Sequence, residues 1–393
     1  MTYSKLRRSF LRNVAVSGAA VGLETWMPNA LAAACPPSQV CPPPAPTTAS
    51  GFLIQRTGVT YPTLQEAANK AQNGDAIYVT PGVYAGNVNC ASINVSVALR
   101  SAIPGQKWRI DTSGERKADG SPNFQGSQAK GLIVKQSGCT QLLIEDCEFV
   151  GAPLIYNNFA GLWTEGGNWQ VTLRDCYFRG CDNGILLNNA LSSNPLDTSN
   201  IVLDGCVFEG CGDFTGSTHN IYAGAIASLT MTGCYSARCN FGHLLKTRAK
   251  QTTLLACRFT GESGTDSFAA DFSNAGDVLI LGCIFEQGIQ TDNPVLITYG
   301  RELQFWTQVK DNRINRFRMY QSTVVNDLGS GRPLYMKRIA ASTSQTLAPS
   351  TVSGQGIPSW KGSGASGGGS NPPSLPQRWT STESGLAAAT MEE

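Results

Sequence analysis

The chain has 393 residues, with 30 basic and 28 acidic side chains and a formal net charge of +2. So balanced a charge argues against bulk electrostatic binding of nucleic acid. The length would allow two globular domains or one solenoid, and the 42 glycines suit the tight turns of a solenoid.

The N-terminal segment has the features of an export signal. Arg7 and Arg8 form a twin-arginine motif, which is followed by a weakly apolar stretch and a run of small residues ending at Ala34. Residues 1–34 are therefore predicted to be a twin-arginine signal peptide, and the protein to be periplasmic or secreted. An alternative is a lipoprotein, because Cys35 directly follows the expected cleavage site. No later apolar stretch is long enough to span a bilayer, so no membrane span is predicted.

Composition divides the remainder of the chain into three parts. Residues 35–51 are rich in proline and predict an extended linker. Residues 346–393 are rich in Gly, Ser and Pro and predict a disordered tail. The residues between these two segments, 52–345, are predicted to form one repetitive domain.

The segment TLQEAANKAQNGDAIYVTPGVY, residues 63–84, predicts a short helix followed by a strand. Four small or apolar residues lie at helical spacing, namely Leu64, Ala67, Ala68 and Ala71. A turn at Asn73-Gly74-Asp75 then leads into a strand containing Ile77 and Val79. We expect this amphipathic helix to cover the first coil of the repetitive domain against water.

Six repeats follow, each with a β-rich run, a cysteine and usually an aromatic residue two positions later. Examples are LLIEDCEF, VTLRDCYF and IVLDGCVF, and the cysteines are Cys147, Cys176, Cys206, Cys234, Cys257 and Cys283. The successive spacings of 29, 30, 28, 23 and 26 residues vary more than a helical repeat allows, whereas coils of short strands can absorb insertions in their turns. The pattern predicts a parallel β-helix whose coils are about 4.8 Å apart.

The ladder cysteines are predicted to form an inward-facing column of small apolar side chains. A second set, Cys181, Cys211 and Cys239, follows three of them by five residues. Because the chain carries an export signal and 13 cysteines, disulfides between adjacent coils are an alternative. A cysteine metal cluster is disfavoured, since CxxC spacing with histidine partners is absent.

The helix and strand of residues 63–84, together with the cysteine ladder, resemble the pectin-lyase-like right-handed parallel β-helix proteins over roughly residues 52–310. The resemblance implies an all-β, single-stranded right-handed parallel β-helix with a short N-terminal capping helix. It also implies an exported protein that acts on carbohydrate along a groove on the parallel sheet. That superfamily includes lyases, hydrolases, epimerases and non-catalytic adhesins, so the function depends on the site.

The chain has two histidines, His219 and His243, and both fall in consecutive coils. Aligning THNIYAG, GHLLKTR and SFAADFS places the histidines beside each other and beside Phe268. The same alignment places Tyr222 beside Lys246 and Asp271. The segment GILLNN adds Asn188 to this column, and Arg248 flanks it.

Strand alternation predicts which of these side chains face outward. If Ile221, Leu245 and Ala270 face inward, then Asn220, Tyr222, Lys246, Arg248 and Asp271 face outward. The histidines share the inward parity unless a turn follows them. A buried, hydrogen-bonded histidine pair and a structural Lys246–Asp271 ion pair are therefore alternatives to a functional cluster.

The functional interpretation is β-elimination of a uronate-containing polysaccharide, which needs a base, an acid and cations to stabilise an enolate-like charge. The predicted catalytic residues are His219, Tyr222, His243, Lys246, Arg248 and Asp271. The predicted substrate-binding residues are Asn188, Asn220, Asn293, Tyr299 and Trp163. No metal ligand is assigned to this site, and the sequence carries no signal for an oligomeric state.

Three alternatives remain at this stage. A hydrolase would use two carboxylates from the set Asp266, Asp271, Asp292, Glu262 and Glu286. Epimerisation begins with the same proton abstraction, and a binding or adhesive rod would need no chemistry. Calcium (Ca2+) is a further candidate cofactor, with Asp266, Asp271 and Asp292 as its ligands.

Overall fold

The computed structural model describes residues 50–114, 130–151, 158–166, 168–187, 198–213, 215–302 and 314–327, together with the backbone of four later strands. The predicted signal peptide, and the predicted linker up to residue 49, therefore lie outside the described residues. No helix in the described ranges is long and apolar enough to cross a membrane.

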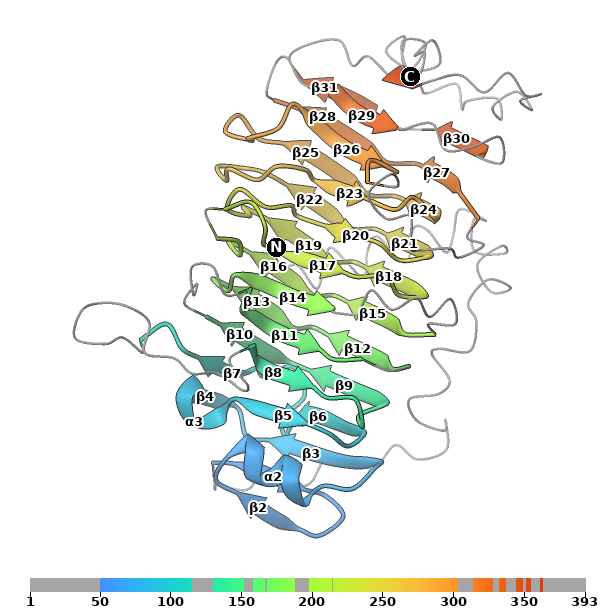
Figure 1. The fold of residues 1–393 in the computed structure, drawn as a ribbon. Helices are drawn as coiled ribbons and strands as arrows, with labels where there is room; N and C mark the ends of the chain where they lie inside the picture. Colours follow the sequence, from blue (N-terminus) through green and yellow to red (C-terminus); the bar gives the residue numbers. More distant parts are fainter. Residues whose placement is uncertain are drawn as a thin grey trace. The chain divides into compact units, whose positions relative to one another are not determined.

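A small cap precedes the repeats (Figure 1). Strand β1 (Phe52–Ile54) pairs antiparallel with β2 (Val59–Tyr61) and with β3 (Asp75–Val79). Helix α2 (Leu64–Lys70) lies between them in the chain and buries Leu64, Ala67 and Ala68. The Thr63 side chain caps this helix by accepting a hydrogen bond from the Glu66 backbone N–H at 3.2 Å. The predicted helix and following strand are thus confirmed.

The remaining strands form three parallel sheets, named A, B and C. In addition to β1, β2 and β3, sheet A contains β6 (Val97–Ser101), β9 (Gln141–Glu145), β12 (Gln170–Arg174), β15 (Asn200–Asp204), β18 (Ser228–Thr232), β21 (Gln251–Leu255), β24 (Asp277–Leu281), β27 (Arg316–Tyr320) and β30 (Ser344–Ala348). Sheet B contains β4 (Gly82–Ala85), β7 (Trp108–Asp111), β10 (Cys147–Val150), β13 (Tyr177–Arg179), β16 (Val207–Glu209), β19 (Tyr235–Ala237), β22 (Arg258–Thr260), β25 (Ile284–Gln287), β28 (Thr323–Asn326) and β31 (Thr351–Gly354). Sheet C contains β5 (Ala91–Ile93), β8 (Gly131–Lys135), β11 (Ala160–Thr164), β14 (Asn183–Leu187), β17 (Ile221–Ala223), β20 (Lys246–Thr247), β23 (Ala270–Phe272), β26 (Val295–Tyr299), β29 (Arg332–Met336) and β32 (Lys361–Gly362).

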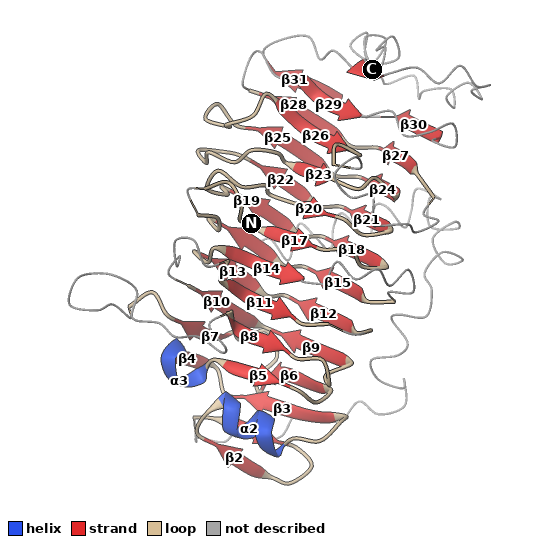
Figure 2. Ribbon diagram, viewed as in Figure 1, coloured by secondary structure: helices blue, strands red, loops and turns tan. Residues whose placement is uncertain are grey.

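From β3 onward, neighbouring strands within each sheet are three apart in chain order, so the chain visits sheets A, B and C in turn and then repeats (Figures 1 and 2). All pairs after β3 are parallel and in register. This arrangement is a parallel β-helix, as the sequence predicts. A four-residue helix, α3 (Gly86–Asn89), interrupts an early turn. Strands β31 and β32 lie beyond residue 345, where the sequence predicts the domain to end.

The turn from sheet A to sheet B explains why each ladder cysteine follows a small or turn-forming residue. The residue before the cysteine has a left-handed backbone in every repeat, as at Asp146 (φ 55°), Gly205 (φ 65°) and Ala256 (φ 52°). One such residue suffices to redirect the chain from one sheet to the next. The left-handed conformation favours Gly, with Asp also tolerated, which matches the residue found in every repeat except that of Ala256.

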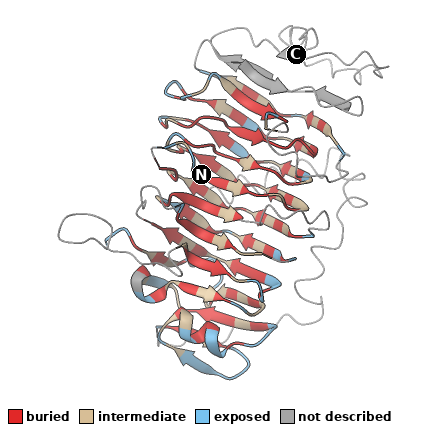
Figure 3. Cartoon of the chain, viewed as in Figure 1, coloured by how far each residue is buried: buried red, intermediate tan, exposed pale blue. Residues whose placement is uncertain are grey.

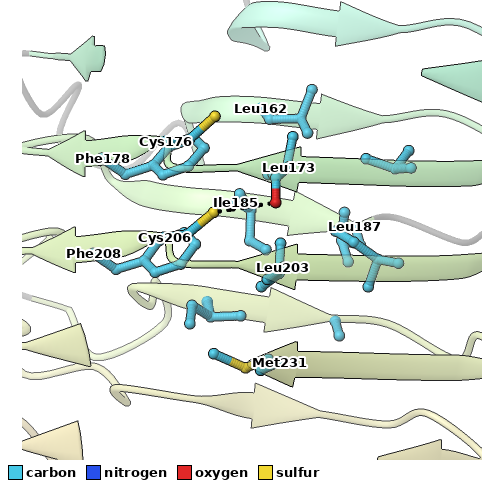
Figure 4. Close-up of a cluster of buried hydrophobic side chains, with 14 of the residues drawn as sticks. Leu162, Leu173, Cys176, Phe178, Ile185, Leu187, Leu203, Cys206, Phe208 and Met231 are labelled. Atoms are coloured by element: carbon cyan, nitrogen blue, oxygen red, sulfur yellow. Dashed lines mark hydrogen bonds between the residues drawn. The ribbon is translucent and has the colours of Figure 1, made fainter. Parts of the chain in front are cut away.

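The ladder cysteines and their aromatic partners fill the interior. All six cysteines are buried, and every described cysteine is free, so the disulfide alternative does not apply to the described part of the chain. The Cys206 thiol donates to the Leu173 carbonyl of the preceding coil at 3.4 Å (Figure 4). Phe178 stacks on Phe149 at a centroid distance of 4.4 Å and on Phe208 at 4.8 Å. The buried residues follow the strands coil after coil (Figure 3).

Candidate functional site

The outer face of sheet C carries a column of polar side chains on consecutive strands. Tyr222 of β17 is the register partner of Lys246 of β20, and Lys246 is the partner of Asp271 of β23. The predicted alignment of these three residues is confirmed. On the preceding coil, however, the partner of Tyr222 is Leu186, two residues before Asn188. The alignment of Asn188 with Tyr222 was therefore wrong, and Asn188 itself lies outside the described residues.

The two histidines lie on the same side as Tyr222, although simple alternation places them inward. The His219 ring is 5.7 Å from the Tyr222 ring and 4.5 Å from the His243 ring, and His243 is 4.7 Å from Phe268. Bends at Asn220 and Leu244, directly after the histidines, break the strand alternation. The predicted clustering of the histidines with Phe268 is thus confirmed.

The bend at Asn220 has a cause in the interior. The fourth repeat has Ser236 where most of the others have phenylalanine, so the aromatic stack is interrupted there. The Asn220 side chain turns inward to fill this place, donating to Ser236 Oγ at 3.0 Å and to the Ala237 carbonyl at 2.9 Å. Asn220 is completely buried. Its predicted outward orientation and substrate contact are therefore wrong, because an amide inserted in the core satisfies backbone groups that phenylalanine would not.

Arg248 is the most connected residue of the cluster. Its Nε donates to the Tyr222 hydroxyl at 3.0 Å, and its Nη1 donates to Asn274 Oδ1 at 2.7 Å. Its Nη2 donates to Glu302 at 2.5 Å, and Glu302 also accepts a bond from Lys246 Nζ at 2.8 Å. Arg248 is 4% exposed. It is therefore buried, although strand alternation predicts that it faces outward. These contacts hold the phenol of Tyr222 against a fixed guanidinium.

Asp271 is also less accessible than predicted. It is 1% exposed and accepts hydrogen bonds from Ser273 Oγ at 2.7 Å and from Thr298 Oγ1 at 2.5 Å. Its Oδ2 is 3.7 Å from both His243 Nε2 and Lys246 Nζ. From this buried position, Asp271 orients the side chains of His243 and Lys246.

Electrostatics leave both imidazoles neutral near pH 7. Burial is the main cause that lowers the pKa of His243, to about 4, although Asp271 acts in the opposite direction. Burial and the neighbouring His243 hold the pKa of His219 well below its usual range. Burial tends to raise the pKa of Glu302, but the hydrogen bond from Lys246 and the charges of Lys246 and Arg248 lower it to about 2. Neutral imidazoles can accept protons, and an ionised Glu302 cannot donate one.

Glu302 and Asn274 belong to the cluster but were not predicted from the sequence. Arg248, Asn274 and Glu302 all come from the turns that leave sheet C directly after β20, β23 and β26. Aligning these turns as TRAK, SNAG and GRE places Arg248 beside Asn274, with Glu302 one position further along its turn. The differing turn lengths obscure this signal, because no fixed offset from the ladder cysteine locates all three.

The other predicted substrate-binding residues occupy different environments. Trp163 of β11 is half-buried on the same column, since its register partner is Leu186, and the Lys130 ammonium lies 5.9 Å from its ring centroid. Tyr299 is completely buried, and its hydroxyl donates to the Gly276 carbonyl at 2.7 Å. Asn293 caps a turn by accepting a bond from the Val295 N–H at 3.1 Å. Tyr299 therefore does not face the surface where substrate contact was predicted.

The carboxylates predicted for hydrolysis or calcium binding occupy different environments. Asp266 is buried with its Oδ1 unpartnered, and burial raises its pKa to about 7. Asp292 is exposed, whereas Glu262 and Glu286 pair with Arg238 and Arg258 on sheet B. Across the described ranges, no group of three or more His, Cys, Asp or Glu side chains is arranged to hold a metal ion. The proposed calcium ligands were therefore wrong.

The fold and the site define the class of protein as a parallel β-helix with a polar cluster on the outer face of one sheet. Comparison of the chain with family models, curated proteins and solved structures gives no match.

Proposed function

We propose that this chain is an exported, pectin-lyase-like β-helix enzyme that cleaves an acidic polysaccharide by β-elimination at the cluster on sheet C. The export signal and the N-terminal resemblance support the location and the superfamily. The contact between Arg248 Nε and the Tyr222 hydroxyl, at 3.0 Å, is the observation that carries the reaction. The guanidinium donates to the phenol oxygen and fixes it in one position, from which Tyr222 can exchange a proton with substrate.

The proposed reaction assigns a role to each group. Tyr222, reacting as the phenolate, takes the proton from the carbon beside the uronate carboxylate, and the electron pair forms a double bond as the glycosidic oxygen leaves. The phenol formed in this step passes its proton to the departing oxygen, which returns Tyr222 to the phenolate. Lys246 and Arg248 stabilise the enolate-like charge that develops on the carboxylate. The neutral His219 stacks on Tyr222, and the neutral His243 stacks on His219, so the pair positions Tyr222 without adding positive charge. Asp271 holds Lys246 in place.

Substitution of Tyr222 tests the assignment. Tyr222→Phe should lower kcat on the active polysaccharide at least about 100-fold, because a general acid or base contributes about that factor. Tyr177→Phe is the matched control, since the Tyr177 hydroxyl also bonds a charged partner, Glu209, but on sheet B. The measurement is the absorbance of unsaturated uronate products from a panel of acidic and neutral polysaccharides. Full activity of the Tyr222 variant would rule out this mechanism.

Two alternatives give different products. A hydrolase would release reducing ends without new absorbance, but Glu302, with its pKa near 2, cannot serve as the general acid. A non-catalytic binding rod would release neither. Two observations favour the non-catalytic binding rod. His219 and His243 are only 3% and 7% exposed. Lys246 and Arg248 are both paired with Glu302 of the chain itself. Epimerisation would alter the sugar without cleavage.

A further inference from the structure

One carboxylate of the chain contacts both cations of the cluster at once. Glu302 Oε1 accepts a hydrogen bond from Lys246 Nζ at 2.8 Å, and Glu302 Oε2 accepts one from Arg248 Nη2 at 2.5 Å. Two oxygens of one carboxylate on two charged donors form a strong, directional pairing. An acidic ligand arriving at Lys246 and Arg248 would need the same two donors.

Glu302 is also the most accessible of the three residues. Its side chain is 23% exposed, compared with 12% for Lys246 and 5% for Arg248. The Glu302 carboxylate is therefore more accessible to solvent than either of the two cations that it contacts. Glu302 and Lys246 are separated by 56 positions in the chain, so their contact depends on the stacking of three coils.

The cluster would remain intact if the carboxylate moved away. The backbone N–H of Glu302 donates to the Ser273 carbonyl at 2.9 Å, which holds the turn independently of the side chain. Arg248 would retain its bonds to Tyr222 and Asn274, and Lys246 would remain 3.7 Å from Asp271. Rotation of one side chain is thus sufficient to free two donors.

We propose that Lys246 and Arg248 form a binding site for the carboxylate of an acidic sugar, and that Glu302 occupies this site when no ligand is bound. The identification of the ligand as a uronate rests on the proposed function, whereas the exchange of one carboxylate for another requires no turnover. Glu302 is then an internal competitor. It lowers the apparent affinity for the ligand in proportion to the time that it occupies the site.

The experiment uses Glu302→Gln and sodium glucuronate, with binding measured by calorimetry or by NMR titration. The variant retains the shape of the side chain but removes its charge, so glucuronate should bind at least about tenfold more tightly than to the unaltered chain. Glu286→Gln is the matched control. Glu286 has a side chain 21% exposed and pairs with Arg258 on sheet B, so its variant should bind like the unaltered chain. Adding Lys246→Met to Glu302→Gln should remove the gain.

Unchanged or weaker glucuronate binding by a folded Glu302→Gln variant would overturn the proposal. If that variant does not fold, Glu302→Asp replaces it, because an aspartate is one methylene shorter and cannot reach both cations. It should show a smaller gain of the same sign, and no gain would overturn the proposal equally. Tighter glucuronate binding without unsaturated products from any polysaccharide would support the carboxylate site and reject β-elimination. Unsaturated products together with unchanged glucuronate binding would support β-elimination and reject the carboxylate site.

Discussion

The interior column and the outer cluster are built by the same stacking of coils, yet they differ in composition. In the interior, successive coils contribute the same residue type, as with Phe149, Phe178 and Phe208. On the outer face of sheet C, successive coils contribute Tyr222, Lys246 and Asp271. Identical side chains stacked in register serve stability, because each buries apolar surface against the next. Different side chains stacked in register can form ion pairs and hydrogen bonds between coils, because they bring unlike groups together.

The largest effect should come from breaking the interior column. Phe178→Ala removes a completely buried ring stacked on both sides, and it should lower the free energy of unfolding by about 3 to 5 kcal/mol. Chemical denaturation followed by circular dichroism measures the change. Phe241→Ala is the control, because Phe241 is 36% exposed and its loss should cost less than about 1 kcal/mol. Equal losses at the two positions would show that the stack contributes nothing beyond ordinary surface packing.

A buried carboxyl in the connection between β22 and β23 should give the next largest effect. Burial raises the pKa of Asp266 to about 7, above its ordinary value of 3.8, so the folded state favours the protonated form. Its contribution to stability is therefore present below pH 3.8 and is lost as the pH rises through 7. Asp266→Asn removes this penalty and should raise the free energy of unfolding at pH 8 by about 4 kcal/mol, since one pKa unit corresponds to about 1.4 kcal/mol.

The control for Asp266 is the same pair of proteins, the unaltered chain and Asp266→Asn, compared at pH 4. At pH 4 the aspartate is protonated in the folded state, so the aspartate and the asparagine variant should have similar stabilities. Thermal melts at the two pH values measure the difference. An asparagine variant that gained as much stability at pH 4 as at pH 8 would contradict a buried, titrating carboxyl.

The outer cluster should respond to pH in the opposite direction. The pKa of His243 is lowered from 6.5 to about 4, so the unfolded chain binds a proton that the folded chain does not bind between these values. Its contribution to stability is present above pH 6.5 and falls as the pH drops toward 4, by up to about 3 kcal/mol. His243→Phe retains a ring against His219 and Phe268 but cannot titrate. Between pH 7 and pH 4, the free energy of unfolding of the unaltered chain should therefore fall by up to about 3 kcal/mol more than that of the variant.

That measurement separates His243 from the other acid-sensitive groups. Glu302 loses its stabilising charge only at lower pH, because its pKa is about 2, and His219 is present in both proteins. Parallel stability curves for the unaltered chain and the His243 variant would mean that His243 is solvated in the folded state.

Much of the fold could be predicted from local patterns. The recurring cysteine and phenylalanine mark one position per coil, and the Gly or Asp before five of the six cysteines marks the left-handed turn. The capping helix was predicted because its small apolar residues follow a 3.6-residue period. The column Tyr222, Lys246 and Asp271 was predicted because these coils differ little in length between the histidines and the sheet.

The parts that sequence reasoning missed depend on turns and on the interior. Asn188 was misaligned by two residues, since nothing local fixes the register of Leu186 against Tyr222. Asn220 was assigned outward by alternation, although Ser236 in the interior draws it inward. Tyr299 was treated as a surface residue, yet its ring packs against Phe317 at 5.4 Å in the core.

The sequence by itself determined the repeat, the inward cysteines, the capping helix and the candidate histidines, because these depend on periods of two, of 3.6 and of one coil. Only the tertiary structure decided that Glu302 pairs with Lys246 and Arg248 and that His219 stacks on Tyr222. The physical reason is that turns, unlike strands and helices, have no regular period from which the direction of a side chain can be predicted. Their partners are set by which coils stack above and below, and by the polar groups that burial leaves to be satisfied.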